Sequence, residues 1–326
     1  MKRTGIGLAS LVCWWASLAD ANNSPSPVAK IEAPDWAYPV NPAGATARNV
    51  DRTPVRVPDS RIRFLPAQLA DLFSAPDWYP TDHPVMPDVV ARGRKPDIEA
   101  CGYCHLPDGA GRPENASLAG LPAAYIEQQV RDFGSGARRT AVPGRLPPKL
   151  MTHLSARATD EEIRTAAAYF ASLTPRNQIQ VIETQTVPGT RVAGWIRIID
   201  PAAPREPIGQ RIIEVPVDAE QFEHRDAHCR FIAYVPVGAV AAGKALVNSG
   251  STDRAEACTS CHGADLRGAG AIPGIAGRSP SYIVRQLFDI RSGLRAGSQV
   301  APMAEVARRL SPEQMLQMAA YLATLQ

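Results

Sequence analysis

Two short strings in this sequence share one pattern: Cys101-Gly102-Tyr103-Cys104-His105 and Cys258-Thr259-Ser260-Cys261-His262. In each string two residues separate two cysteines, and a histidine follows the second cysteine at once. The register continues further along the chain, because a tyrosine follows each histidine by 20 residues, at Tyr125 and at Tyr282. The segments next to these tyrosines also match, with Ala-Gly before and Gln after in both copies. A repeat of this length predicts two copies of one domain that contain the same helical segment.

The pattern Cys-x-x-Cys-His is typical of covalent haem attachment. Each thiol adds to one vinyl group of the porphyrin, and one helical turn presents both sulfurs to the edge of the macrocycle. The histidine then binds the iron from the proximal side. Two alternatives are a zinc site made of four thiolates and a thioredoxin-like redox motif, which needs only one Cys-x-x-Cys pair. We expect two covalently attached haem c groups, with attachment at Cys101, Cys104, Cys258 and Cys261 and with iron ligation by His105 and His262.

Methionine provides a candidate sixth iron ligand in each copy. Met151 lies 46 residues after His105, and Met303 lies 41 residues after His262. A capped helix follows each methionine, and the pattern predicts these helices over residues 160–173 and 312–325. The matched positions favour ligation over a core-filling role, and a thioether ligand raises the haem potential relative to two histidines. His153 competes with Met151 because it stands only two residues away.

The composition indicates a folded chain with more than one domain. Of 326 residues, 45% are hydrophobic and 21% are charged, which is enough apolar material for a packed core. The length favours two domains plus connecting segments. A formal net charge of +3 gives no electrostatic case for nucleic acid. Six cysteines are too few for a disulfide scaffold of this length.

Residues 1–21 are predicted to be a secretory signal peptide. Lys2 and Arg3 precede an apolar run over residues 5–18, and small residues at 19 and 21 fit cleavage after residue 21. The run is shorter than the roughly 20 residues that span a bilayer. We therefore expect a soluble mature chain without a transmembrane span. Export places it in the bacterial periplasm, where c-type haem attachment occurs.

Two regions lie outside the repeat. Residues 22–97 hold 13 prolines, so we predict a Pro-rich irregular arm over residues 22–87, disordered to about residue 60 and packed after Phe64. Residues 177–242 alternate β-branched residues with turn signals, which predicts a small antiparallel β-rich insert between the domains. The insert contains Cys229. A free buried thiol is favoured there over a metal site with His224 and His228, or over a thiolate ligand to haem.

On these residues the chain resembles the two-haem, two-domain class I cytochromes c of bacteria. The resemblance covers residues 88–176 and 243–326. It implies a mainly α fold in which two small helical haem domains occupy those ranges, joined by the β-rich insert. In that family a proline often supports the proximal histidine through its carbonyl group. Pro273 matches this residue, whereas Ala116 at the equivalent offset departs from the pattern and leaves the support of His105 open.

The function expected from this resemblance is electron transfer, without catalytic residues. The chain would take single electrons from one redox protein and pass them to another, such as a membrane oxidase or a dehydrogenase. The alternative is an enzyme that oxidises a small compound, or the cytochrome subunit of such an enzyme. The sixth ligand discriminates between them. Two histidine–methionine haems leave no open position on iron, whereas ligation by His153 or Cys229 would favour an enzyme.

Overall fold

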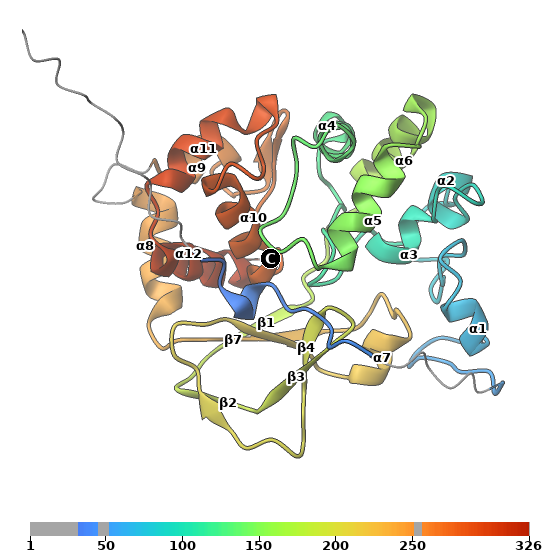
Figure 1. Cartoon of the computed structure of the whole chain (residues 1–326), viewed down its shortest axis with the longest axis horizontal. Helices are drawn as coiled ribbons and strands as arrows, with labels where there is room; N and C mark the ends of the chain where they lie inside the picture. Colours follow the sequence, from blue (N-terminus) through green and yellow to red (C-terminus); the bar gives the residue numbers. More distant parts are fainter. Residues whose placement is uncertain (1–31, 45–51, 251–255, 326) are drawn as a thin grey trace, which may run out of the picture. The chain divides into compact units, whose positions relative to one another are not determined.

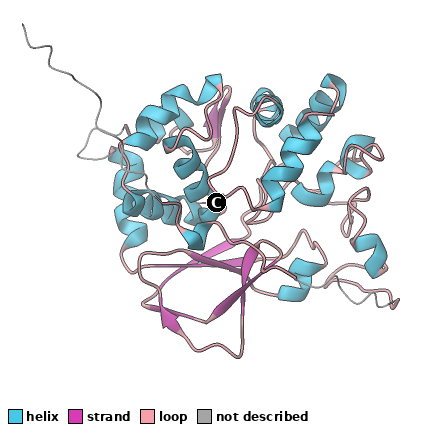
Figure 2. Cartoon of the chain, in the orientation of Figure 1, coloured by secondary structure: helices cyan, strands magenta, loops and turns pink. Residues whose placement is uncertain are grey.

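The computed structural model describes residues 32–44, 52–250 and 256–325. The predicted signal peptide lies outside these residues. Residues 33–326 form one compact unit, in which the helices of the two repeats gather on one side and the longer strands on the other (Figure 2). Within the described ranges, no helix is both long enough and apolar enough to cross a membrane.

The first repeat folds into helices around its motif. Helix α4 packs against α5 and α6, and α2 packs against α3 and α6. Phe170 and Ala167 of α6 are buried between them, together with Val90 of α2 and Ile126 of α4. These helices are α2 (Asp88–Ala91), α3 (Cys101–His105), α4 (Ala123–Gly134), α5 (Leu146–Ser155) and α6 (Asp160–Ser172).

The second repeat uses a similar set of helices, with α12 packed against α8 and α10 (Figure 1). The contact between α8 and α12 is close at Gly243, where a side chain would overlap the main-chain carbonyl of Gln317. The predicted domain boundary at residues 242/243 falls inside α8. The elements are α8 (Ala239–Ser249), α9 (Thr259–His262), β8 (Gly268–Ala269), β9 (Ile272–Pro273), α10 (Pro280–Arg291), η2 (Ser298–Val300), α11 (Ala301–Arg308) and α12 (Pro312–Thr324).

The two predicted terminal helices are confirmed, because α6 and α12 each end within one residue of the expected position. Both begin with the same capping box. The Thr159 hydroxyl accepts from the Glu162 N–H (3.2 Å), and the Glu162 carboxylate accepts from the Thr159 N–H (2.8 Å). Ser311 and Gln314 make the same reciprocal pair at α12. Local capping therefore sets the start of both helices.

Between the repeats, the chain forms strands and one short helix. The main sheet has the order β1-β7-β6, beside a β3–β4 hairpin and a β2–β5 pair. Strand β7 runs antiparallel to β6 but parallel to β1, with Ile179 opposite Phe231. The elements are β1 (Ile179–Glu183), β2 (Thr186–Val187), β3 (Thr190–Ala193), β4 (Ile196–Ile199), β5 (Glu206–Pro207), β6 (Ile213–Pro216), α7 (Ala219–Glu223) and β7 (Phe231–Val235).

The expectation of a wholly antiparallel insert is wrong for the pair β1 and β7. A parallel pair needs a long crossover connection rather than a tight turn. Here the chain between the two strands contains five further strands, β2 to β6, and the helix α7, and it brings β7 back alongside β1 in the same direction. The alternation of β-branched residues predicts strands but not which strands become neighbours.

The N-terminal segment is irregular but packed. Its short helices are η1 (Asp35–Ala37) and α1 (Pro66–Leu69). Tyr38 is buried against α10, where its hydroxyl donates to Asp289 Oδ1 (2.9 Å) and to the Arg285 carbonyl (3.1 Å). Trp36 packs on the apolar cluster of the β region. The expectation of disorder up to about residue 60 is therefore wrong for residues 33–44, because Tyr38 is buried and hydrogen-bonded there and Trp36 is packed.

A buried carboxylate connects the β region to the second repeat. Glu214 of β6 is 4% exposed. Its Oε2 accepts from the hydroxyls of Ser279 (2.7 Å) and Ser281, at the start of α10. Its Oε1 has no hydrogen-bond partner among the described residues. Burial raises the pKa of Glu214, because a charged carboxylate loses its hydration there.

The caps give a test of the helix starts. We expect Thr159→Ala and Ser311→Ala each to lower the free energy of unfolding of the haem-containing protein by about 1 kcal/mol, because each leaves helix N–H groups unpaired. Denaturant unfolding followed by far-ultraviolet circular dichroism measures the change. Thr152→Ala, at an exposed site on α5, is the control. Equal stabilities for the cap variants and the control would contradict the assignment.

Glu214 gives a test of pH dependence. A folded-state pKa above the unfolded value means that the folded protein holds a proton that the unfolded chain has released. Stability therefore falls as the pH rises from about 4.3, the ordinary glutamate pKa, to the folded-state pKa. We expect Glu214→Gln to remove this fall, as measured by denaturant unfolding across that window. Glu256→Gln, at an exposed site, serves as control. If the free energy of unfolding fell with pH by the same amount in Glu214→Gln and in the wild type, the prediction would be contradicted.

Candidate haem-binding sites

The first motif forms the one-turn helix α3. Cys101 and Cys104 are three residues apart on it, so their side chains lie on one face. Neither thiol forms a disulfide. His105 is buried, and its Nδ1 lies 2.8 Å from the Ala116 carbonyl oxygen. With the proton on Nδ1 donated to that oxygen, the Nε2 lone pair is free to bind a metal.

The second motif has the same geometry. Helix α9 begins directly after Cys258, and Cys261 is the exposed thiol of the pair. His262 Nδ1 lies 2.8 Å from the Pro273 carbonyl oxygen, again 11 residues further along the chain. The absence of proline at residue 116 therefore has no consequence for His105. The support comes from a backbone carbonyl, which any residue provides.

The chemistry of these side chains fits a haem. Burial lowers the pKa of both His105 and His262, so the imidazoles are neutral, as an iron ligand must be. Burial also raises the pKa of the Cys101 thiol to about 12 and that of Cys258 to about 11. Apolar surroundings of this kind suit thioether bonds to a porphyrin edge rather than free thiolates.

The zinc alternative is contradicted. A zinc site would bring both Cys-x-x-Cys pairs to one point. In the part of the chain that the structure describes, no three His, Cys, Asp or Glu side chains converge as metal ligands would. The same finding excludes a metal site at Cys229 with His224 and His228. Cys229 is instead 3% exposed in an apolar cluster with Phe222 and Phe231.

The methionines lie on equivalent helices. Met151 is on α5 and Met303 on α11, and both are partly buried. Met303 packs against Val300 and Ala307. His153 is exposed. Two residues along an α-helix correspond to a rotation of about 200°, so His153 faces away from the side that Met151 occupies. Methionine as the sixth ligand stays a prediction, and this geometry favours Met151 over His153.

Two arginines join the repeats, and the sequence reasoning missed them. Arg138 and Arg295 each follow the histidine of their own motif by 33 residues, so the repeat itself carried the signal. The two residues form an antiparallel bridge. Beside it, the Arg139 N–H donates to the Leu294 carbonyl (2.7 Å). This contact places equivalent loops of the two repeats against each other.

Both guanidinium groups reach across to the other repeat and contact its tyrosine and glutamine. The bonds run from Arg138 Nη2 to Tyr282 Oη (2.8 Å) and Gln286 Oε1 (2.8 Å), and from Arg295 Nη2 to Tyr125 Oη (2.7 Å) and Gln129 Oε1 (2.7 Å). Each guanidinium also donates to the glutamine of its own repeat. The partners occupy equivalent positions, so the contact has a twofold-like pattern.

This interface is rich in buried positive charge. Arg278 lies nearby and donates to the Ser117 carbonyl (2.9 Å). The Nε atoms of Arg278 and Arg295 have no partner among the described residues. Burial acts to raise the pKa of Tyr125, but the guanidiniums of Arg295 and Arg138 outweigh it and lower that pKa. Carboxylates are the natural complement of such groups, and a haem carries two as its propionates.

The shared acceptors give a test of the interface. We expect Arg138→Gln and Arg295→Gln each to lower the free energy of unfolding by about 1–3 kcal/mol, because buried acceptors lose their donors. The double variant should deviate from additivity by at least about 0.5 kcal/mol, since both arginines bond to the same glutamines. Denaturant unfolding of the haem-containing protein measures the free energies of the wild type, the two single variants and the double variant. Arg164→Gln, exposed on α6, is the control, and additive losses would contradict a coupled network.

Comparison with known proteins agrees with this geometry. Residues 240–326 match the Cytochrome c family model. Cytochrome c-554(548) of Halomonas halodenitrificans is 36% identical over 70 residues, which are 84% of its length and 21% of this chain. Cytochrome c-552 of Acidithiobacillus ferridurans is 39% identical over 84 residues, 26% of this chain but only 35% of that protein. The thiosulfate dehydrogenase electron acceptor of Thiomonas intermedia is 26% identical over 233 residues, which are 70% of this chain and 79% of that protein's length. The chain belongs to the cytochrome c family, and it carries two covalently bound haem c groups.

Proposed function

We propose that this cytochrome is exported to the periplasm and carries single electrons between two redox proteins there. One haem domain would occupy residues 88–176 and the other residues 243–326, with the β-rich insert at 177–242 and the Pro-rich arm at 22–87. The observation that carries the proposal is the pair of motif helices. In each of them a histidine is held through Nδ1 by a carbonyl 11 residues further on.

The proposed attachment residues are the four motif cysteines, and the proposed proximal ligands are the two motif histidines. A bound haem supplies an iron that changes by one electron without any transfer of atoms. The chain holds each imidazole neutral and fixed in orientation, because Ala116 and Pro273 accept its Nδ1 proton. A ligand that is fixed in both oxidation states needs little rearrangement when the iron changes charge.

Met151 and Met303 complete the two proposed ligand sets. Their equivalent places on α5 and α11 support this, as does the exposure of the competing His153. Two histidine–methionine sets would leave no coordination position for a substrate. They would also place both potentials above those of bis-histidine haems. This argument favours a carrier over an enzyme that binds its substrate on iron.

The proposed donor is a periplasmic dehydrogenase and the proposed acceptor is a second redox protein, such as a membrane oxidase. The relative from Thiomonas intermedia supports the first assignment, because its name describes an electron acceptor of thiosulfate dehydrogenase. On the same ground, a permanent place as the cytochrome subunit of a dehydrogenase is the second candidate. Purification from the native cell distinguishes them, since a subunit would remain with its dehydrogenase.

Haem content tests the ligand assignment. We expect two haems per wild-type chain by pyridine haemochrome assay. Replacing both cysteines of one motif by alanine should leave one haem, whichever motif is changed. Met151→Ala and Met303→Ala should each keep two haems and lose part of the charge-transfer absorption that marks methionine bound to ferric haem. The loss would follow from removal of the thioether sulfur from iron.

His153→Ala is the matched control, because it removes the competing ligand from the same helix. It should leave the methionine absorption unchanged. One haem in the wild-type chain would contradict the assignment of one attachment site to each motif. Full methionine absorption in both methionine variants would instead contradict the sixth-ligand assignment and leave the attachment sites intact.

A further inference from the structure

The two motif helices differ sharply in exposure. Tyr103 of α3 is 5% exposed. Ser260 holds the equivalent position in the second motif and is exposed. The neighbouring thiols follow the same trend, because Cys104 is partly buried whereas Cys261 is exposed. The N-terminal arm and the insert, which belong to neither repeat, account for this difference in exposure.

The N-terminal arm covers one side of α3. The Tyr103 hydroxyl donates to the Leu69 carbonyl at the end of α1 (3.0 Å), and its ring packs with Ala75. The helix also lies close to α2, since a side chain at Gly102 would come within 2.9 Å of the Val90 carbonyl oxygen. The first motif is therefore enclosed by main chain as well as by side chains.

The insert contacts the same residue of α3. Arg225 follows α7 and donates from Nη1 to the Tyr103 carbonyl (2.9 Å). Its guanidinium stands 3.6 Å from the centre of the Tyr103 ring, in cation–π contact. The backbone of Arg225 is left-handed, with φ of 56°, a conformation that arginine rarely adopts. The surrounding structure thus holds this residue in place over the tyrosine.

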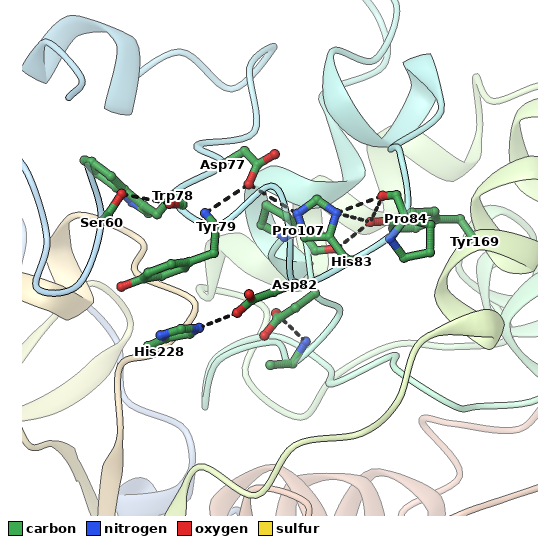
Figure 3. A network of polar contacts seen from close by, with 12 residues as sticks. Ser60, Asp77, Trp78, Tyr79, Asp82, His83, Pro84, Pro107, Tyr169 and His228 are labelled. Carbon is green, nitrogen blue, oxygen red and sulfur yellow. Dashed lines mark hydrogen bonds and ion pairs between the residues drawn. The ribbon is translucent and has the colours of Figure 1, made fainter. Parts of the chain in front are cut away.

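The arm and the insert are also joined to each other (Figure 3). Trp78 Nε1 donates to the His224 carbonyl (2.9 Å). His228 Nε2 lies 2.8 Å from Asp82 Oδ2, and its ring stacks on Tyr79 with centroids 3.6 Å apart. These contacts make the two segments one continuous cover over α3.

The same cover is anchored to the first repeat. His83 lies 3.2 Å from Asp77 Oδ1 through Nε2 and 3.1 Å from the Tyr169 hydroxyl through Nδ1. Tyr169 of α6 in turn donates to the Pro107 carbonyl (2.7 Å), two residues after the motif histidine. Figure 3 shows this chain of contacts beside the pair formed by Asp82 and His228. The cover is therefore bound to the haem loop itself.

Among the described residues that follow α9, the exposed ones nearest the second motif are mostly small and uncharged. Ala264 and the turn over residues 269–272 are exposed around α9. The charged residues Asp265 and Arg267 lie 3.9 Å apart and offset each other. We define the second haem edge as Ser260, Cys261, Ala264 and residues 269–272. A partner matched to it would present uncharged, apolar residues around its own cofactor.

We infer that the arm and the insert close the attachment edge of the first haem, so that partner proteins exchange electrons at the second haem edge. This inference rests on the proposed function. The step moves one electron and no atoms. The partner would lose one electron to the haem held by the second motif, and the same electron would then pass between the repeats to the haem held by the first motif.

Oxidation kinetics test the inference. The fully reduced protein is mixed with excess hexacyanoferrate(III), and separately with tris(bipyridine)cobalt(III), in a stopped-flow instrument. We expect a fast phase whose rate rises with oxidant concentration and a slow phase whose rate does not. The slow phase reports internal transfer from the covered haem. Two phases that both rise with oxidant concentration in the wild type would overturn the inference.

The two motifs provide matched variants. Tyr103→Ser gives the first motif the residue of the second, and should make the slow phase rise several-fold with oxidant concentration. Ser260→Tyr makes the reverse exchange, and should slow the fast phase several-fold. Tyr103→Phe keeps the ring and should keep a concentration-independent slow phase. A strong preference for one charge sign of oxidant at the second edge would overturn the assignment of an uncharged partner face.

A readout without electron transfer tests the cover directly. In hydroxyl-radical footprinting of the haem-containing protein, Tyr103 should be protected in the wild type and labelled several-fold more in Arg225→Ala. Every variant is first assayed for haem. A wild-type chain with fewer than two haems would count against the proposed function. A wild-type chain with two haems whose Tyr103 is freely labelled would overturn only the inference that the arm and the insert cover α3.

Discussion

The hydrogen bond from each motif histidine to a carbonyl 11 residues further on is the constraint around which both repeats are arranged. It fixes the tautomer and the plane of the imidazole, and it ties the motif helix to the loop that leads into α4 or α10. Since the acceptor is a main-chain oxygen, the side chain that carries it can change, as Ala116 and Pro273 show. The geometry is conserved between the copies where the residue type is not.

The duplicated parts meet through duplicated residues. Arg138 and Arg295 exchange hydrogen bonds with the tyrosine and glutamine of the opposite repeat, so one set of side chains serves both sides of the contact. The arm and the insert break this symmetry, because both contact α3, where the buried Tyr103 contrasts with the exposed Ser260 of the second motif. Two chemically equivalent attachment sites thereby acquire different surroundings, which is how one chain can give different roles to two copies of one cofactor.

Local signals in the sequence predicted local structure well. The capping boxes at Thr159 and Ser311 predicted the starts of α6 and α12, and the motif spacing predicted one-turn helices. Long-range pairings escaped prediction. The parallel pairing of β1 with β7, and the burial of Tyr38 against Asp289 some 251 residues away, depend on contacts that no local pattern encodes. The interface arginines could have been predicted, because each follows the histidine of its own motif by 33 residues and so belongs to the repeat.

The burial of Cys229 has a consequence for the maturation of the chain. Until porphyrin is attached, the four motif thiols are available for disulfide exchange, and a fifth reactive thiol would offer them wrong partners. Cys229 is enclosed in the core of the β region, and burial raises the pKa of its thiol to about 12. Exchange requires an accessible thiolate. Once the β region has folded, its only cysteine no longer competes, and each pair of motif thiols is left to its own haem.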